Sequence, residues 1–424
     1  MSLKYIVLGV TAAVLLAACG GRDDGADAPV SEANVPELPH VRTVTIPADE
    51  RFVEHLQTAL ITADEGDKIQ LPEGTFNLTD GLSLDVNRVT LAGVGQGKTV
   101  LSFAGQEGAG EGLLVTSDDV TLTDFTMQDT AGDGIKSKGA DRITYTDLTV
   151  EWTGGPLATN GAYGVYPVES ADVLVDAVTV RGASDAGIYV GQSRNIIVRN
   201  SLVEYNVAGI EIENSIGADV HDNVAENNTG GVLVFDLPDL PMVGGHSTRI
   251  FNNRIVNNNT DNFAPPGNIV ASVPSGSGVM VLANENVHIF DNELSNNRTA
   301  HVLLAAYQDE FEDARYNPLP RNVVVRDNSY EGGGDDPQGA LAGLAALVGG
   351  ALPPIVWDGV IRWGETPDQE VNLVLNEDED IGFVSLGFGT YPIDPAAIAP
   401  SIERPEGTVL DEPLPIVIAH DTAG

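Results

Sequence analysis

The feature that most constrains the fold is a short phrase that recurs along the chain. A β-branched strand runs into an Asn or Asp-Asn corner, then into polar residues, and then into a Gly followed by Ile or Val. Clear copies occupy residues 196–210, 220–232, 250–259 and 289–297. Such a repeat indicates one supersecondary unit stacked on itself, because each unit buries its apolar side chains only against its neighbours.

The Gly-aliphatic steps set the length of this unit at 22–23 residues. They begin at Gly134, Gly164, Gly187, Gly209, Gly231 and Gly278. Longer separations predict an insertion at 152–162 and a larger one at about 236–276. The unit is too short for a βαβ crossover, and it alternates apolar with polar residues over short runs. Asn and Gly suit tight corners because they tolerate a left-handed backbone.

These features predict an all-β fold, a parallel β-helix over residues 43–336. Stacked coils would place strand on strand and pile the corner asparagines into hydrogen-bonded ladders. The alternative is an antiparallel sandwich, which also has short strands and turn signals. Asn-Gly hairpin signals between alternating runs are almost missing, however, and this favours the β-helix.

A capping helix is expected before the repeats, at about 49–63, with Asp49 as its N-cap. Its apolar face is marked by Phe52, Leu56, Ala59, Leu60 and Ala63. Such a cap is physically necessary because the open end of a solenoid would expose core side chains and unpaired strand edges.

The first nineteen residues carry a targeting signal. Lys4 precedes an apolar run at 5–16 that is too short to span a membrane. The run ends in Leu-Ala-Ala-Cys19, which resembles the bacterial lipobox, where the Cys becomes the lipidated first residue. We therefore expect a signal peptide at 1–18, a flexible tether at 19–42 and a membrane anchor at Cys19. An ordinary secretory signal with an incidental Cys is the alternative.

The repeats from about Val89 to Ser329, with the segment 52–76, resemble the right-handed parallel β-helix proteins of the pectate-lyase-like superfamily. Together with the lipobox and the Trp-Asp-Gly tail at 357–359, they resemble a bacterial lipoprotein subgroup of parallel β-helix repeat proteins. Members of that subgroup are often encoded near c-type cytochromes, and their activity is not established. The resemblance implies a right-handed parallel β-helix. The residue after Cys19 is Gly20 and not an aspartate, which in bacterial lipoproteins favours outer-membrane sorting, so we expect an outer-membrane lipoprotein facing the periplasm or cell surface. The resemblance transfers no catalytic residue, since one fold hosts many functions.

Charge narrows the partners. The whole chain carries −41, and loss of residues 1–18 removes Lys4 and no acid, which gives −42. Nucleic acid is excluded as a partner because so acidic a surface repels phosphates. An acidic polysaccharide would need a local basic patch or bridging cations. The single cysteine, Cys19, leaves no intramolecular disulfide.

Two of the four lysines that remain after residue 18 lie at i and i+2, so Lys136 and Lys138 share one face of a strand. The repeat register predicts two outward stripes. The first contains Lys136, Tyr166, Tyr189, Glu211, Leu233 and Met280. The second contains Lys138, Val168, Gly191, Glu213, Phe235 and Leu282. The apolar end of both stripes is too large to stay bare, so we expect the long insertion or the C-terminal segment to cover it.

The stripes predict a binding face for a polysaccharide or an envelope protein. The candidate binding residues are Lys136, Lys138, Tyr166, Tyr189, Glu211 and Glu213. The tyrosines offer stacking faces, and the lysines could hold a carboxylate or sulfate. The alternative is a carbohydrate-active enzyme, a lyase, epimerase or hydrolase, with Glu211, Lys136 and Tyr189 as the catalytic candidates. Ion pairs between the lysines and nearby acids are the structural alternative to either role.

A metal role is the weaker alternative, as copper or calcium handling in the periplasm. No cofactor is predicted firmly. Asn376, Asp378 and Asp380 place oxygen ligands at alternate positions, a spacing that calcium loops use, but the usual Gly and the bidentate Glu are missing. Residues 337–424 are expected to form an irregular C-terminal cap with a short helix, followed by an extended arm.

Overall fold

The computed structural model describes residues 42–108, 110–346 and 349–421. These residues belong to one compact unit that spans 41–424. The predicted signal peptide, most of the tether and Cys19 lie outside the described residues and stay predictions. No helix in the described ranges is long and apolar enough to cross a membrane.

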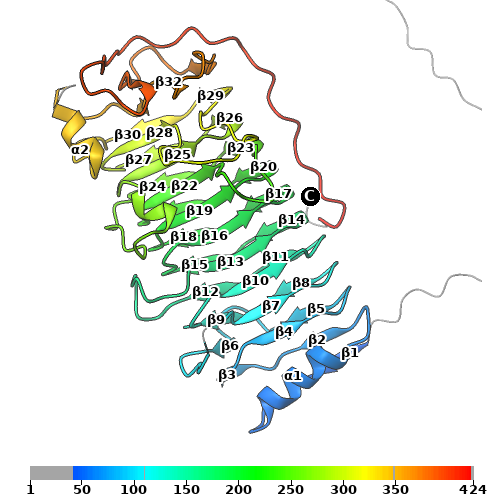
Figure 1. The fold of residues 1–424 in the computed structure, drawn as a ribbon. Coiled ribbons are helices and arrows are strands. Elements are labelled where there is room, and N and C mark those ends of the chain that lie inside the picture. Colours follow the sequence, from blue (N-terminus) through cyan, green and yellow to red (C-terminus); the bar gives the residue numbers. More distant parts are fainter. Residues whose placement is uncertain (1–41, 109, 347–348, 422–424) are drawn as a thin grey trace, which may run out of the picture. The chain divides into compact units, whose positions relative to one another are not determined.

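Three long sheets of parallel strands run the length of this unit (Figure 1). Sheet A contains β1 (Thr43–Thr45), β2 (Lys68–Gln70), β5 (Thr90–Ala92), β8 (Thr121–Thr123), β11 (Thr144–Thr146), β14 (Ala171–Asp176), β17 (Arg194–Arg199), β20 (Ile216–His221), β23 (His246–Phe251), β26 (Glu285–Phe290), β29 (Val323–Arg326) and β33 (Leu373–Asn376). Sheet B contains β3 (Gly74–Asn77), β6 (Thr99–Ser102), β9 (Thr126–Gln128), β12 (Thr149–Glu151), β15 (Thr179–Arg181), β18 (Leu202–Glu204), β21 (Val224–Glu226), β24 (Arg254–Val256), β27 (Glu293–Ser295) and β30 (Ser329–Glu331). Sheet C contains β4 (Leu82–Leu84), β7 (Leu113–Val115), β10 (Ile135–Lys138), β13 (Tyr163–Val168), β16 (Ala186–Gly191), β19 (Ala208–Glu213), β22 (Gly230–Phe235), β25 (Ser277–Leu282), β28 (Ala300–Ala305), β31 (Ile355–Trp357) and β34 (Phe383–Ser385).

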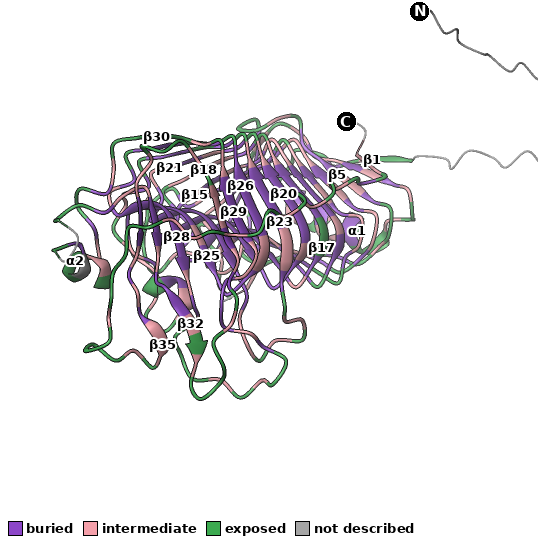
Figure 2. Cartoon of the chain, turned by 90° about the horizontal axis from the view of Figure 1, so that it is seen from above, coloured by how far each residue is buried: buried purple, intermediate pink, exposed green. Residues whose placement is uncertain are grey.

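Each complete coil contributes one strand to each sheet, and the interior between the sheets is a continuous apolar core whose residues are buried (Figure 2). The Gly-aliphatic steps lie in register on sheet C, where Ile188 pairs with Ile210 and Ile210 pairs with Val232. These side chains are fully buried because alternate residues of each strand point into the coil. The parallel β-helix and the 22–23-residue unit predicted from the sequence are thereby confirmed.

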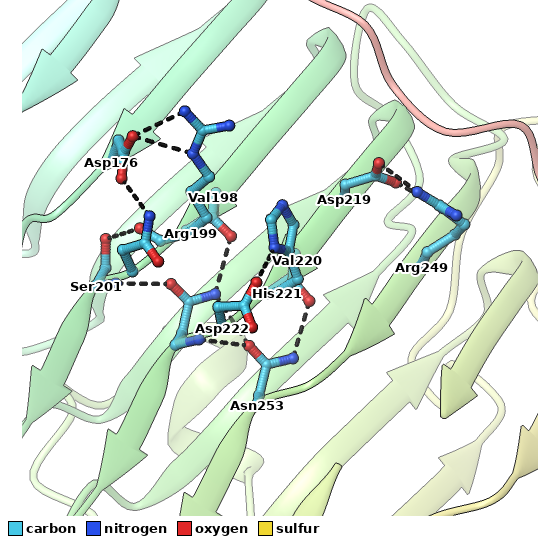
Figure 3. Close-up of polar contacts among 12 residues, drawn as sticks. Asp176, Val198, Arg199, Ser201, Asp219, Val220, His221, Asp222, Arg249 and Asn253 are labelled. Atoms are coloured by element: carbon cyan, nitrogen blue, oxygen red, sulfur yellow. Dashed lines mark hydrogen bonds and ion pairs between the residues drawn. The ribbon is translucent and has the colours of Figure 1, made fainter. Parts of the chain in front are cut away.

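Stacked asparagines fix the corner between sheets A and B. The Asn223 side-chain amide donates to Asn253 Oδ1 at 3.0 Å and to the Val198 carbonyl at 2.9 Å. Asn253 in turn donates to Asn292 Oδ1 at 3.0 Å. It also donates to the Val220 carbonyl (Figure 3). All three side chains are buried, and each amide finds partners in the neighbouring coil. The predicted asparagine ladder is therefore present.

Helix α1 (Phe52–Thr62) caps the N-terminal end of the solenoid. It buries the predicted face at Phe52, Leu56, Ala59 and Leu60, and Phe52 stacks on the Phe76 ring. The N-cap differs from the prediction. Arg51 takes that position, while the Asp49 carboxylate accepts a hydrogen bond from the Arg51 backbone N–H and its carbonyl accepts from Phe52. The helix begins later than expected because Asp49 forms a turn ahead of it.

The long insertion predicted at 236–276 is divided in two. Strands β23 and β24 lie inside this interval and complete a regular coil. One loop, 236–245, precedes them, and a second, 257–276, follows them and contains the short 3-10 helix η1 (Ile269–Ser272). The steps at Gly231 and Gly278 lie on neighbouring strands of sheet C, so their spacing shows how many residues are inserted in this coil but not that they are divided between two corners.

The C-terminal end also departs from the predicted boundary at 336. Strands β31, β33 and β34 continue sheets A and C beyond it, so the coils persist past the short helix α2 (Ala340–Ala345). Strands β32 (Val360–Trp363) and β35 (Gly389–Tyr391) pair separately. The short helix expected in this segment is present as α2.

The predicted arm after Pro392 runs back along the outer face of sheet A (Figure 1). Glu412 bridges Arg249 and Arg326 at 2.6 and 2.8 Å, and Asp421 pairs with Arg199 at 2.6 Å. Figure 3 shows Arg199 and Arg249 with their local acids on this face. The arm therefore occupies part of the outer face of sheet A.

Candidate functional site

The two predicted stripes lie on the outer face of sheet C in the expected register. Lys136 pairs with Tyr166, Tyr189 with Glu211, and Glu211 with Leu233. In the second stripe Lys138 pairs with Val168. Gly191 pairs with Glu213, which pairs in turn with Phe235. Alternate residues of a strand point to opposite sides, which explains this arrangement. Ile135 and Ser137, on either side of Lys136, are buried inside the coil.

At the N-terminal end of this face, Lys136 is held by two carboxylates and a ring. Its Nζ lies 3.2 Å from Glu111 Oε1, 3.6 Å from Asp133 Oδ2 and 4.7 Å from the centroid of the Tyr166 ring. Lys138 is more exposed, and its Nζ lies 3.7 Å from Glu169. Both lysines are thus paired with acids of the chain. Glu111 was missed by sequence reasoning because it lies in a loop ahead of its strand.

Three tyrosine rings pack together next to Lys136. The ring centroids of Tyr163, Tyr166 and Tyr189 lie 4.5–4.9 Å from one another. Tyr166 is half-buried, whereas Tyr189 is buried. Tyr163 lies outside the predicted stripes because it precedes the Gly-aliphatic step. The one sequence feature that could have pointed to Tyr163 is its position at the start of β13, directly after the insertion at 152–162.

An inner acid cluster, defined here as Asp185, Glu211 and Glu213, follows the tyrosines. All three residues are buried, with Glu211 only 1% exposed. Burial raises the pKa of Asp185 and the pKa of Glu213 each to about 7, and raises the pKa of Glu211 well above its ordinary value. The predicted solvent exposure of Tyr189, Glu211 and Glu213 is therefore wrong, because a loop covers them.

Hydrogen bonding within the inner acid cluster is uneven. Tyr189 donates its hydroxyl to Glu213 Oε1 at 2.7 Å, and the Asn268 amide donates to Asp185 Oδ2 at 3.0 Å. Both carboxyl oxygens of Glu211 are buried without a hydrogen-bond partner. The residues that shift these three pKa values most are other acids, tyrosines and Asn268, and none of them is a cation.

Much of the cover comes from the loop 257–276, the roof loop. Val270 and Val273 of this loop pack with Leu233, Phe235 and Leu282 in one buried apolar cluster. Leu237 and Tyr307 from two other loops pack on the same cluster. The Asn262 side chain braces the roof loop by donating to the carbonyls of Val270 and Val273. The prediction that an insertion covers the apolar end of the stripes is confirmed. The roof extends farther than predicted because Asn268 reaches Asp185.

Comparisons with known proteins agree with this architecture. A family model described as "Right handed beta helix region" matches residues 111–262. The chain is a right-handed parallel β-helix protein. The comparison with curated proteins gives no match.

Solved structures with this β-helix architecture include two polygalacturonases. A hyperthermoactive exopolygalacturonase from Thermotoga maritima has a TM-score of 0.50 at 10% identity, over 80% of this chain and 93% of that chain. A polygalacturonase from Erwinia carotovora ssp. carotovora has a TM-score of 0.50 at 13% identity, over 86% and 97% of the two chains. At such low identity these similarities show the fold alone.

The β-helix also has an apolar cavity of about 370 Å³ beyond the roof loop. Its walls include Phe235, Met280 and Leu303 on sheet C, Leu341 of α2 and Phe388 near the C-terminal end. The buried Asp358 carboxylate at this cavity accepts hydrogen bonds from the backbone N–H groups of Ala306 and Val360. The cavity differs from the inner acid cluster in polarity, because mainly apolar side chains line it.

Among the described residues of the β-helix, no group of three or more His, Cys, Asp or Glu side chains is arranged to hold a metal ion. At the acidic turn of Asn376, Asp378 and Asp380, the Arg404 guanidinium donates to the carbonyls of Glu377, Asp378 and Ile381. Calcium at this turn and copper handling stay predictions.

Raising the pH from 5.5 to 8.5 should loosen the roof loop. In the closed structure the pKa of Asp185 and the pKa of Glu213 lie above the ordinary carboxyl value of about 4. Their contribution to closure is therefore complete below about pH 4 and is lost as the pH rises through about 7. This loosening would be measured by hydrogen exchange, corrected for its intrinsic pH dependence. The protection of the backbone amides of Asn268, Ala271 and Val273 should fall by about tenfold.

Glu213→Gln should reduce this pH response, because it removes one titrating group while leaving an oxygen to accept from Tyr189. Glu293→Gln, at the exposed first residue of β27, is the matched control and should leave the response unchanged. Equal protection of the roof loop at both pH values would contradict the account.

Proposed function

We propose that the protein is an envelope-anchored lipoprotein that binds a polysaccharide on the outer face of sheet C. The observation that supports this most is the half-buried Tyr166 ring beside Lys136, Glu111 and Asp133. Aromatic faces stack on sugar rings, and carboxylates accept hydrogen bonds from sugar hydroxyls. Strands about 4.8 Å apart present such groups at regular steps along an extended chain.

The face continues toward the N-terminal end without a roof. Leu114 lies beside Lys136 in the next coil, and Ser83 lies beside Leu114. Ser83 is exposed, and Leu114 and Lys136 are half-buried. An extended glycan laid from Ser83 to Tyr166 would therefore meet an open surface, with the roof loop as a wall at its far end.

The ion pairs disfavour an acidic glycan. Lys136 and Lys138 already face Glu111, Asp133 and Glu169, so neither lysine is left to neutralise a uronate or sulfate. The sequence-based hypothesis that these lysines hold an anionic group is therefore replaced by a preference for uncharged or positively charged sugars. An envelope protein remains the alternative partner for the same face.

A carbohydrate-active enzyme is the second candidate function. Burial raises the pKa of Asp133, although Lys136 opposes this shift, and a carboxyl with a raised pKa serves as a general acid or base. The sequence-based catalytic candidates Glu211 and Tyr189 lie under the roof loop, and Lys136 lies outside it. Chemistry at Glu211 would require the roof loop to move.

Replacing Tyr166 tests the binding face. Tyr166→Ala should weaken glycan binding by about tenfold, because the sugar would no longer cover the apolar ring surface, a loss of about 1–2 kcal/mol. Binding of neutral, amino-sugar and uronate oligosaccharides would be measured on an array and by calorimetry. Tyr205→Asn is the matched control, because Tyr205 is exposed after β18 and Asn tolerates its positive φ.

The same mixtures would be assayed for new reducing ends and unsaturated ends. Product formation that Glu211→Gln abolishes would favour the enzyme over the binding protein. Absence of binding to every glycan, or equal affinity of Tyr166→Ala and the wild type, would rule out the proposed face.

Anchoring through Cys19 is proposed from the lipobox-like sequence. In a bacterial host the full chain should incorporate a clickable fatty acid and fractionate with membranes. Cys19→Ala removes the only thiol of the chain and should abolish both properties. Labelling that persists in Cys19→Ala would contradict the anchor.

A further inference from the structure

Lys136 shows how this face of sheet C accommodates an ammonium group. Two carboxylates, Glu111 and Asp133, lie within 3.6 Å of its Nζ, and the Tyr166 ring lies beneath it at 4.7 Å. Carboxylates supply charge and hydrogen-bond acceptors, and the ring face attracts the cation through its quadrupole. The Lys136 ammonium group thus shows how two carboxylates and an aromatic ring can bind a cation on this face.

The inner acid cluster repeats this composition farther along the same face. Tyr163 and Tyr189 supply the rings, and the three carboxyls replace Glu111 and Asp133. Glu211 sits one coil beyond Tyr189 in the stripe that begins at Lys136. Among the described residues, however, no lysine or arginine is ion-paired with Asp185, Glu211 or Glu213. The inner acid cluster therefore has carboxyl groups and tyrosine rings like those around Lys136, but none of the cationic side chains that the structure describes lies among them.

Glu211 is the residue that most needs such a partner. Both of its carboxyl oxygens are buried and make no hydrogen bond, whereas Asp185 and Glu213 each accept one. A buried polar group without a partner is destabilising, and the great majority of such groups in folded proteins are satisfied. An ammonium group could donate up to three hydrogen bonds to these carboxylates at once.

We propose that the inner acid cluster binds the ammonium group of an amino-sugar-containing glycan, with Glu211 as its principal partner. The inference rests on the proposed glycan-binding function of this face and adds the chemical class of the ligand. The glycan would lie over Tyr166 and reach Glu211 when the roof loop moves aside. Asn268 would then exchange its bond to Asp185 for water or for the sugar.

A metal ion fits the cluster less well than an ammonium group. A hard cation such as calcium needs six to eight oxygen ligands that converge at 2.3–2.6 Å, as a general rule. In the described part of the chain no three acidic or histidine side chains are arranged in that way. An ammonium group is larger, takes acceptors at hydrogen-bond distance, and is also attracted by the surrounding tyrosine rings.

The test compares two oligomers that differ only in charge and acetylation. A glucosamine hexamer and an N-acetylglucosamine hexamer would be titrated into the full protein by calorimetry at pH 6.5. The glucosamine hexamer should bind about tenfold more tightly, which is the size expected for one charge-assisted hydrogen-bonded contact. Glu211→Gln, which keeps the shape of the side chain, should abolish this preference while retaining the binding of the neutral hexamer.

Glu293→Gln is the control for the overall negative charge of the protein. It removes one exposed carboxylate on sheet B and should leave the preference for the glucosamine hexamer intact. Thermal unfolding would establish that each variant is folded, and Glu213→Gln provides a second substitution in the cluster. That variant should also weaken the preference.

The outcomes separate the two claims. Binding of the neutral hexamer with no preference for the glucosamine hexamer would overturn the ammonium site and leave the glycan-binding face standing. An equal loss of preference in Glu211→Gln and Glu293→Gln would also overturn the site, because it would assign the effect to net charge. Failure of both hexamers and of all other glycans to bind would overturn the proposed function as well.

Discussion

The hydrogen-bonded asparagine ladder at the corner of sheets A and B holds the coils in register, and the functional face depends on that register. Each buried amide of Asn223 and Asn253 is satisfied by the next asparagine and by a strand carbonyl. A slip of one residue would break these bonds and turn every side chain of a strand to the opposite side. Glu211, whose strand β19 precedes Asn223 in the same coil, would then point into an apolar core. The ladder thus fixes which residues a ligand can meet.

The three sheets differ in what covers their outer faces. On sheet A, acidic residues of the C-terminal arm pair with a row of arginines that includes Arg199, Arg249 and Arg326. On sheet C, the roof loop covers the middle coils, while Lys136 and Tyr166 remain partly open. Because sheet A is partly occupied by the chain itself, sheet C offers the open aromatic face. The candidate site is therefore located by which outer faces the loops and the C-terminal arm leave open, more than by the fold itself.

Much of this arrangement follows from the sequence. Strand alternation and the spacing of the Gly-aliphatic steps were enough to align Lys136, Tyr166, Tyr189 and Glu211, because both are local properties of a repeat. The apolar residues that follow Glu211 in the stripe also predicted a cover. Periodicity carries this information as long as each coil has the same length.

The remaining features depend on contacts between distant segments. Asn268 meets Asp185 across 83 residues of sequence, and no spacing rule predicts how far a loop of this kind reaches. The same holds for Glu111 and Tyr163, which lie outside the regular stripes, and for the arm residue Asp421 against Arg199. Burial of Glu211 and its raised pKa depend on the roof loop, so neither could be predicted from local sequence patterns.

The most direct test of the binding face is a crystal structure of the protein with a bound glucosamine oligomer. The account predicts sugar density along the outer face of sheet C, with one ring against Tyr166 and an amino group at hydrogen-bond distance from Glu211. The bond between Asn268 and Asp185 should be broken in that complex. Sugar bound to the outer face of sheet A or B, or in the apolar cavity, with the roof loop still closed, would contradict the account.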